Sequence, residues 1–163
     1  MLDFNFIKLV SRAIIKHWDS TDPFLLAGYM CAVISDAEKI CCRFVSKEIL
    51  IRSFVLIDRL RKLYPNAKGE KGCSHRLFFV AYKIACDSKI DLDWAQLSNG
   101  VFNEEELDRM TDEFVRFLKF NLKISEREIV YWEDFFNRDW QRVPRGLAVP
   151  ESTEHLVPVL IEE

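Results

Sequence analysis

Residues 74–89 read SHRLFFVAYKIACDSK, and their apolar side chains would occupy nearly every face of a helix. A helix that is apolar all round is typical of the middle of a bundle, where each face has a covering neighbour. We therefore expect a central helix that starts at Ser74, with residues 76–86 almost wholly buried.

The rest of the chain predicts further helices around this one. The sequence has five glycines and five prolines, and the long stretches between them contain no helix breaker. No alternation typical of strands persists, so the predicted fold class is all-α. Apolar periodicity with start and stop signals predicts helices at about 3–18, 23–42, 46–64 and 92–98, then one that opens at Asn103 and one that opens at Ser125.

The last two helix starts carry paired polar residues. Asn103 with Glu106 resembles a capping box, in which two side chains satisfy free amides of the first turn, and Ser125 with Glu128 repeats the pattern. In the helix after Asn103, helical spacing predicts a buried stripe made of Leu107, Met110, Phe114, Phe117 and Leu118.

Length and composition favour one domain with one core. The chain has 163 residues, of which 49% are apolar. We expect a single domain over residues 1–142, followed by an extended, proline-containing tail over residues 143–163. The run LVPVLI at 156–161 is more apolar than expected for a tail that contacts nothing. Docking onto the domain and disorder therefore remain as alternatives.

Charge and cysteine content argue against several classes of protein. A formal net charge of −3 argues against a nucleic-acid binder and a basic membrane-surface protein. No apolar run approaches the ~20 residues of a membrane span, and the opening residues do not resemble a signal peptide. The cysteines are at 31, 41, 42, 73 and 86. This set is best explained by free thiols in a reducing intracellular compartment, cytoplasm or nucleus. We expect Cys31 and Cys86 to be inaccessible.

No motif indicates catalysis or metal binding. His17, His75 and His155 are scattered, without the neighbours that a catalytic base or a zinc site needs. The carboxylates of EEELDRMTDE at 104–113 are expected to form a solvated helix face, with a paired acid–base site as a minor alternative. We therefore expect a non-catalytic protein without a cofactor or a metal.

Three segments in a fixed order carry a resemblance to a known family. They are LIDR at 56–59, HRL at 75–77, and a stretch that runs from Glu106-Leu107 to Ile124-Ser125. Their order and spacing resemble the cyclin box, over about residues 23–140. HRL in particular is similar to the P-type cyclins that activate the fungal phosphate-response kinase, and an extra helix ahead of the box also suits a P-type cyclin.

The cyclin resemblance implies a five-helix box over about residues 23–122, with an extra helix before it and another after it. It implies no catalytic activity. The implied partner is a cyclin-dependent, proline-directed protein kinase in cell-cycle or phosphate signalling, whose mobile helix docks on the third and fifth box helices. The alternative is a cyclin-fold adaptor that binds another protein and activates no kinase.

The resemblance also implies a kinase-binding surface. The Lys that many cyclins have at the end of the third box helix falls on Asp87 when counted from His75, and on Lys83 when counted back from Gly100. The first count is preferred because an insertion disturbs a loop less than a buried helix. The Glu of the fifth box helix falls on Thr111. The implied surface, opposite the core stripe, comprises Lys83, Asp87, Asp108, Thr111, Asp112 and Val115, with Lys119 on the same stripe.

Four further residues are expected to be structural. In the family, the Asp of the LDR triplet pairs with an Arg on the first box helix. This chain offers only Lys39 near that place, so Asp58 is expected to pair with Lys39 or to be satisfied differently. His75 and Arg76 are expected to have structural roles at the start of the central helix.

Overall fold

The structure is a computed structural model that describes residues 2–18, 23–40, 46–67, 73–86 and 92–142. Within these ranges the chain forms helices, turns and short connections without a strand, which confirms the all-α prediction. The helices are α1 (Phe4–Trp18), α2 (Pro23–Ile40), α3 (Lys47–Leu63), α4 (Cys73–Ala85), α5 (Trp94–Leu97), α6 (Glu104–Phe117) and α7 (Glu126–Arg142). The expected tail at 143–163 lies outside the described residues.

The predicted caps set three of the helix starts. Ser46 accepts the amide of Ile49 at 3.2 Å at the start of α3. The Asn103 side chain accepts the amide of Glu106 at 2.8 Å and donates to the Glu106 carboxylate at 3.0 Å, so this pair caps one backbone amide and its second bond joins the two side chains. The Ser125 pattern also forms at the start of α7, so the polar signals fixed where these helices begin.

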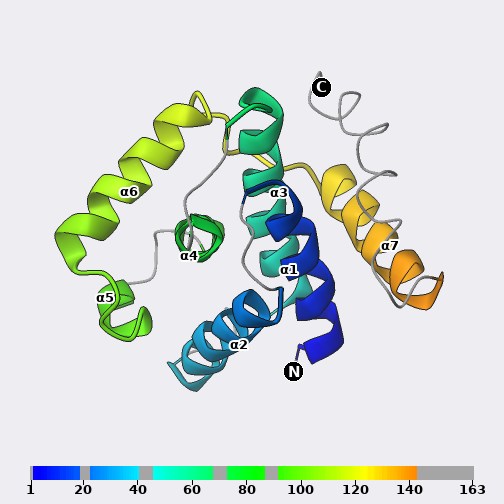
Figure 1. The fold of residues 1–163 in the computed structure, drawn as a ribbon, viewed down its shortest axis with the longest axis horizontal. Coiled ribbons are helices and arrows are strands. Elements are labelled where there is room, and N and C mark those ends of the chain that lie inside the picture. The colour runs from blue at the N-terminus through cyan, green and yellow to red at the C-terminus, as the bar shows by residue number, and fades with distance from the viewer. Residues whose placement is uncertain (1, 19–22, 41–45, 68–72, 87–91, 143–163) are drawn as a thin grey trace.

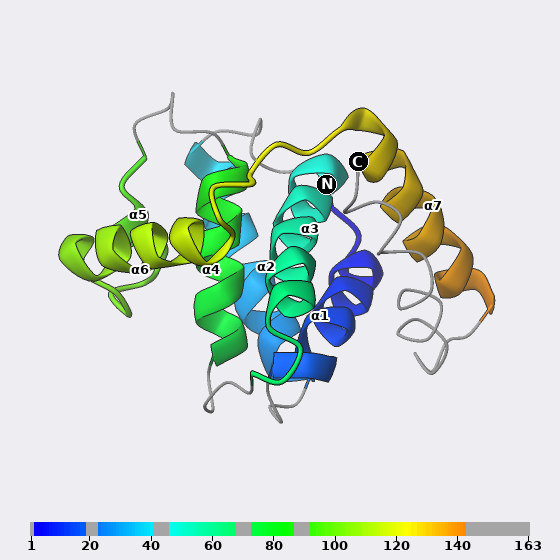
Figure 2. The ribbon, with the colours of Figure 1, turned by 90° about the horizontal axis from the view of Figure 1, so that it is seen from above.

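The 13-residue helix α4 runs through the middle of the molecule and is seen end-on in Figure 1. It packs against α1, α2, α3 and α6. The short helix α5 and the longer α6 together form one edge of the molecule. Helix α7 forms the opposite edge, beyond α1 and α3, as the view from above in Figure 2 also shows. Among the described residues, none of the helices is both long and apolar enough for a membrane span.

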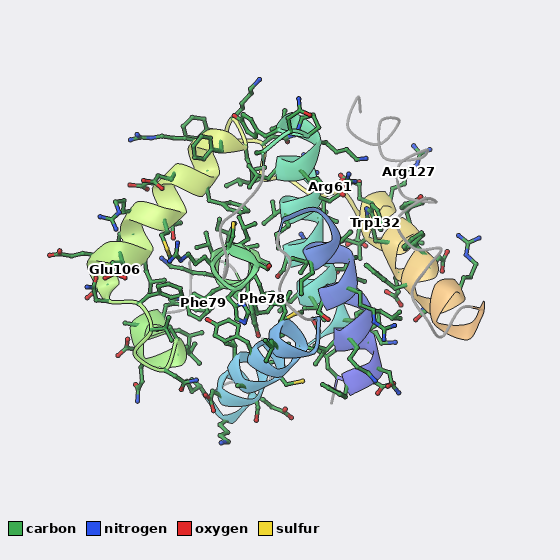
Figure 3. The ribbon with its side chains drawn as sticks, in the orientation of Figure 1. Arg61, Phe78, Phe79, Glu106, Arg127 and Trp132 are labelled. Carbon is green, nitrogen blue, oxygen red and sulfur yellow. The ribbon has the colours of Figure 1, made fainter. Side chains whose placement is uncertain are left out.

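Aromatic side chains fill the core on both sides of α3. On one side, Phe54 of α3 lies with its ring centroid 4.8 Å from that of Trp132 and 5.1 Å from that of Phe136. On the other side, Phe79 of α4 lies 5.8 Å from Phe102. Figure 3 shows Phe78 and Phe79 in the middle of the molecule and Trp132 between α3 and α7. All of these side chains belong to one connected cluster.

The expected burial of residues 76–86 is only partly right. Residues 78–82 are buried, but Leu77 and Ile84 are half-buried and Arg76 is exposed. The helix is covered on most of its circumference, and its first turn borders an open groove between α3 and α6.

The stripe predicted for α6 also needs one correction. Leu107, Phe114 and Leu118 are buried, and Met110 is half-buried. Phe117 is 52% exposed. The buried line of α6 runs through Met110, Phe114 and Leu118, which are four positions apart, and Phe117 lies beside that line.

The buried Asp58 of α3 has a partner that sequence reasoning did not identify. Asp58 is paired with Arg61, one turn further along the same helix, at 2.9 Å. Lys39 is paired with Asp36 at 3.7 Å and is exposed, so the expected Asp58–Lys39 pair is wrong and the alternative, that Asp58 is satisfied differently, is right. Burial raises the pKa of the Asp58 carboxyl, and the Arg61 charge opposes that rise.

Arg59 joins α3 to the connection between α6 and α7. Its guanidinium donates to the backbone carbonyls of Asn121 at 2.9 Å and Lys123 at 2.8 Å, and to the carboxylate of Glu128. The Arg59 side chain is 9% exposed. A buried guanidinium needs several acceptors, and this one finds them in a segment more than 60 positions away.

The thiols follow the sequence expectation with one exception. Cys31, Cys73 and Cys86 are free, and Cys86 is buried. Cys31 is half-buried instead of inaccessible, and it packs against the edge of the core. Cys41 and Cys42 lie outside the described residues.

Candidate protein-interaction surface

Three of the residues expected to bind a kinase meet between α4 and α6. The ammonium of Lys83 donates to the Thr111 hydroxyl at 3.3 Å and lies 3.8 Å from the Asp108 carboxylate. Thr111 in turn donates to the backbone carbonyl of Leu107, which fixes its side chain. Two helices far apart in sequence thus place a cation, a hydroxyl and a carboxylate on one shared surface.

Of the other residues expected to bind a kinase, two lie on the same flank of α6, one follows the helix and one is outside the described residues. Asp112 is exposed and Val115 is half-buried on the same flank of α6. Lys119 lies just past the end of the helix, with a left-handed backbone at φ 55°. Asp87 lies outside the described residues. The polar stripe is therefore a flank beside the buried line and not the face opposite to it, since Thr111 and Val115 are half-buried.

A hollow of about 460 Å³ adjoins Lys83 on this flank. Asp93, Glu104 and Asp108 supply three carboxylates to its lining, against the single ammonium of Lys83. Trp94 adds an aromatic wall. Because acidic groups outnumber basic ones here, this surface suits a partner that brings positive charge.

The opposite flank of α6 borders a second, larger groove that sequence reasoning missed. Its volume is about 1100 Å³, and it lies between α6, the first turns of α4 and the end of α3. Apolar side chains dominate its walls, including Leu77, Met110 and Phe117. The sequence signal for it was the position of Phe117, one residue short of the buried Leu118, which marks an apolar side chain outside the core line.

Two aromatic polar side chains of this groove come from α2 and α4. The ring of Tyr29 lies 4.9 Å from that of His75, and both line the groove. Burial raises the pKa of Tyr29 to about 12, so its phenol stays neutral at physiological pH. The described residues include no group of histidine, cysteine and carboxylate side chains placed to hold a metal ion.

The expected structural residues His75 and Arg76 both lie at this groove. His75 is half-buried against Tyr29. Arg76 points away from the core and is exposed, so its placement is that of a rim residue and not of a buried structural one.

Comparisons with known proteins assign no family to the chain. No family model, no curated protein and no solved structure matches it. The functional argument therefore rests on the residues and geometry of this chain.

Proposed function

We propose that this chain is a cyclin-box regulatory subunit that binds a protein kinase and favours its active conformation. The observation that carries the proposal is the meeting of Lys83 on α4 with Thr111 and Asp108 on α6. The resemblance puts the kinase contacts of the family on the third and fifth box helices, and the proposal assigns these places to α4 and α6.

The packing of α4 supports this proposal. A cyclin box has a central third helix wrapped by the other box helices, and α4 packs against α2, α3 and α6 while its segment 78–82 is buried. The helix α1 adds a further contact to α4 from outside the proposed box.

The Lys83 environment also suggests how the surface departs from the usual pattern. Many cyclins pair a lysine with a glutamate at these places. Here the position of the glutamate holds Thr111, and the carboxylate is supplied one turn earlier by Asp108, which is 72% exposed in its side chain. On the count from Gly100, which puts the lysine position on Lys83 and not on the preferred Asp87, the cation is kept and the anion is displaced along the same flank by three residues.

A non-catalytic subunit activates a kinase only through differential binding. Its contacts must be better with the active position of the mobile kinase helix than with the inactive one. The acidic hollow beside Lys83 provides such contacts for a kinase helix that carries basic residues, and it makes association sensitive to salt.

The test begins with the full chain as bait in native lysate, followed by measurement of the activity of the captured kinase. In the variant Asp108→Arg with Asp112→Arg, we expect kinase binding to weaken at least about tenfold, since two exposed carboxylates of the contact become cations. The matched control is Glu126→Arg with Asp134→Arg, which makes the same charge change on exposed positions of α7.

Each outcome separates the two candidate classes. A kinase that is captured, activated and lost only in the α6 variant supports the proposal. A different protein as the main partner, with no kinase activated, contradicts it and favours the adaptor. Equal loss in both variants shows a general charge effect and also contradicts a specific contact on α6.

A further inference from the structure

The groove on the other flank of α6 has no part in the proposed kinase contact. It lies between α3, α4 and α6, and its volume of about 1100 Å³ is enough for a short peptide segment. Lys83, Asp108 and Thr111 do not line it. An occupant of this groove and a kinase on the Lys83 flank therefore use different sides of the same helix.

Exposed aromatic side chains gather at one end of the groove. Phe117 is 52% exposed and Tyr64 36% exposed, and their ring centroids lie 5.7 Å apart in an edge-to-face arrangement. Both line the groove. Large apolar side chains left together in water are typical of a binding site.

The rim of the groove offers two arginines. Arg76 from α4 and Arg109 from α6 are exposed, and within the described parts of the chain neither forms an ion pair. The lining also holds two carboxylates, Glu113 and Glu106, the second of which accepts from Asn103 in the helix cap, so the formal charges balance although neither arginine is paired with them. The groove therefore suits an apolar segment that carries its own carboxylates.

The chain contains a segment of this kind. Residues 154–163 read EHLVPVLIEE, an apolar run at 156–161 bounded by Glu154 on one side and by Glu162 and Glu163 on the other. Thirteen residues, 143–155, separate this run from the end of α7. Extended, they span up to about 45 Å, which is longer than the roughly 37 Å diameter of a domain of this length but shorter than half its circumference, so the connection must take a direct path over one face of the domain.

We propose that residues 156–161 bind in this groove within the same molecule, with the flanking carboxylates near Arg76 and Arg109. The proposal does not depend on the kinase contact. It gives the exposed aromatic end of the groove an apolar occupant and gives the rim arginines partner carboxylates. It also gives the apolar run at 156–161 a structural role, which composition alone does not explain.

The first experiment places a photo-crosslinking benzoylphenylalanine at Val159 of the full chain. We expect irradiation of a dilute sample to give a crosslink within one molecule, which peptide mass spectrometry maps to the groove residues of α4 and α6. The control places the same group at Val130, which is exposed on α7 and does not line the groove. Crosslinks from position 159 to other surfaces, no crosslink, or crosslinked dimers alone overturn the proposal.

The second experiment tests the charges with a reversal and its rescue. Arg76→Glu with Arg109→Glu should lower the yield of the groove crosslink about two- to fivefold, as expected for exposed ion pairs, and Glu162→Arg with Glu163→Arg should restore it. Arg138→Glu, on exposed α7, should leave it unchanged. A crosslink that resists the reversal, in variants whose circular dichroism shows intact helices, overturns the assigned charge contacts.

Discussion

Glu128 accepts two hydrogen bonds from a single nitrogen of Arg59, at 3.0 and 2.9 Å, although the two residues lie 69 positions apart. The same carboxylate accepts the amide of Ser125 at 3.3 Å, so it also caps α7. One side chain thus starts α7 and attaches it to α3. The contact also shows that the segment after the expected box, which ends near residue 122, is tied to a buried charge inside that box.

Replacement of Arg59 should be among the most damaging changes in the protein. Arg59→Ala leaves the mostly buried Glu128 and two carbonyls without their donor, so we expect the free energy of unfolding to fall by about 3–5 kcal/mol. Urea denaturation measures it. The control, Arg52→Ala, removes a partly exposed pair with Glu48 at 3.8 Å and should cost under ~1 kcal/mol. Similar losses in the two variants would contradict a special role for Arg59.

The helix starts could be predicted from sequence because their causes are local. Asn103 and Glu106 lie three positions apart, and a helix brings that spacing together wherever it stands. The partners of Arg59 could not be predicted, because two of them are backbone carbonyls, which every residue has. No side-chain pattern distinguishes the carbonyls of Asn121 and Lys123 from any others.

The candidate surface was predictable in its members but not in its arrangement. Lys83 and Thr111 were named from counting along a family pattern, and the structure brings them within 3.3 Å. Sequence periodicity placed Phe117 in the core, because it ranks all apolar residues on a helix side alike. Which of them is covered depends on the neighbour, and none of the described helices covers the Phe117 side.

Truncation of Phe79 should show the cost of a cavity in the centre of the bundle. Phe79 is fully buried against Phe102 and Trp94, so Phe79→Ala should lower the free energy of unfolding by about 3–5 kcal/mol. Phe117→Ala, the same change at a 52% exposed site, should cost under ~1.5 kcal/mol. Thermal and urea unfolding give both values, and a cost below ~1 kcal/mol for Phe79→Ala would place that residue outside the core.

The protein should lose stability in alkaline solution through Cys86. Burial raises the pKa of this thiol from its ordinary value of 9.0 to about 12, and a hydrogen bond with Tyr82 opposes the rise. The folded state therefore favours the neutral thiol. The contribution of Cys86 is fully present below pH 9 and is lost between pH 9 and 12, with a slope of at most ~1.4 kcal/mol per pH unit.

Urea denaturation at several pH values between 8 and 11 measures this slope. The variant Cys86→Ala should be less stable at pH 8 but should show a shallower decline above pH 9, because the titrating group is gone. Equal slopes in the two proteins would mean that Cys86 does not contribute to the alkaline loss.

Glycine should be tolerated at position 120 better than at a neighbouring helical position. A left-handed phenylalanine costs about 1–2 kcal/mol of backbone energy, which glycine avoids, and the exposed ring buries little. We expect Phe120→Gly to leave the free energy of unfolding unchanged or to raise it by up to about 1 kcal/mol. Phe117→Gly, inside α6, should lower it by about 1 kcal/mol or more. A large loss in Phe120→Gly would show that its side chain is buried in solution.

The packing of the first described helix on the last one has a consequence for synthesis on the ribosome. Phe6 of α1 rests with its ring centroid 5.7 Å from that of Phe136 of α7, and Phe54 of α3 also contacts Phe136. A nascent chain that lacks α7 therefore displays these aromatic side chains to water until residue 136 has left the exit tunnel. Emerging chains of this protein should accordingly be captured by chaperones until α7 appears, with release soon afterwards.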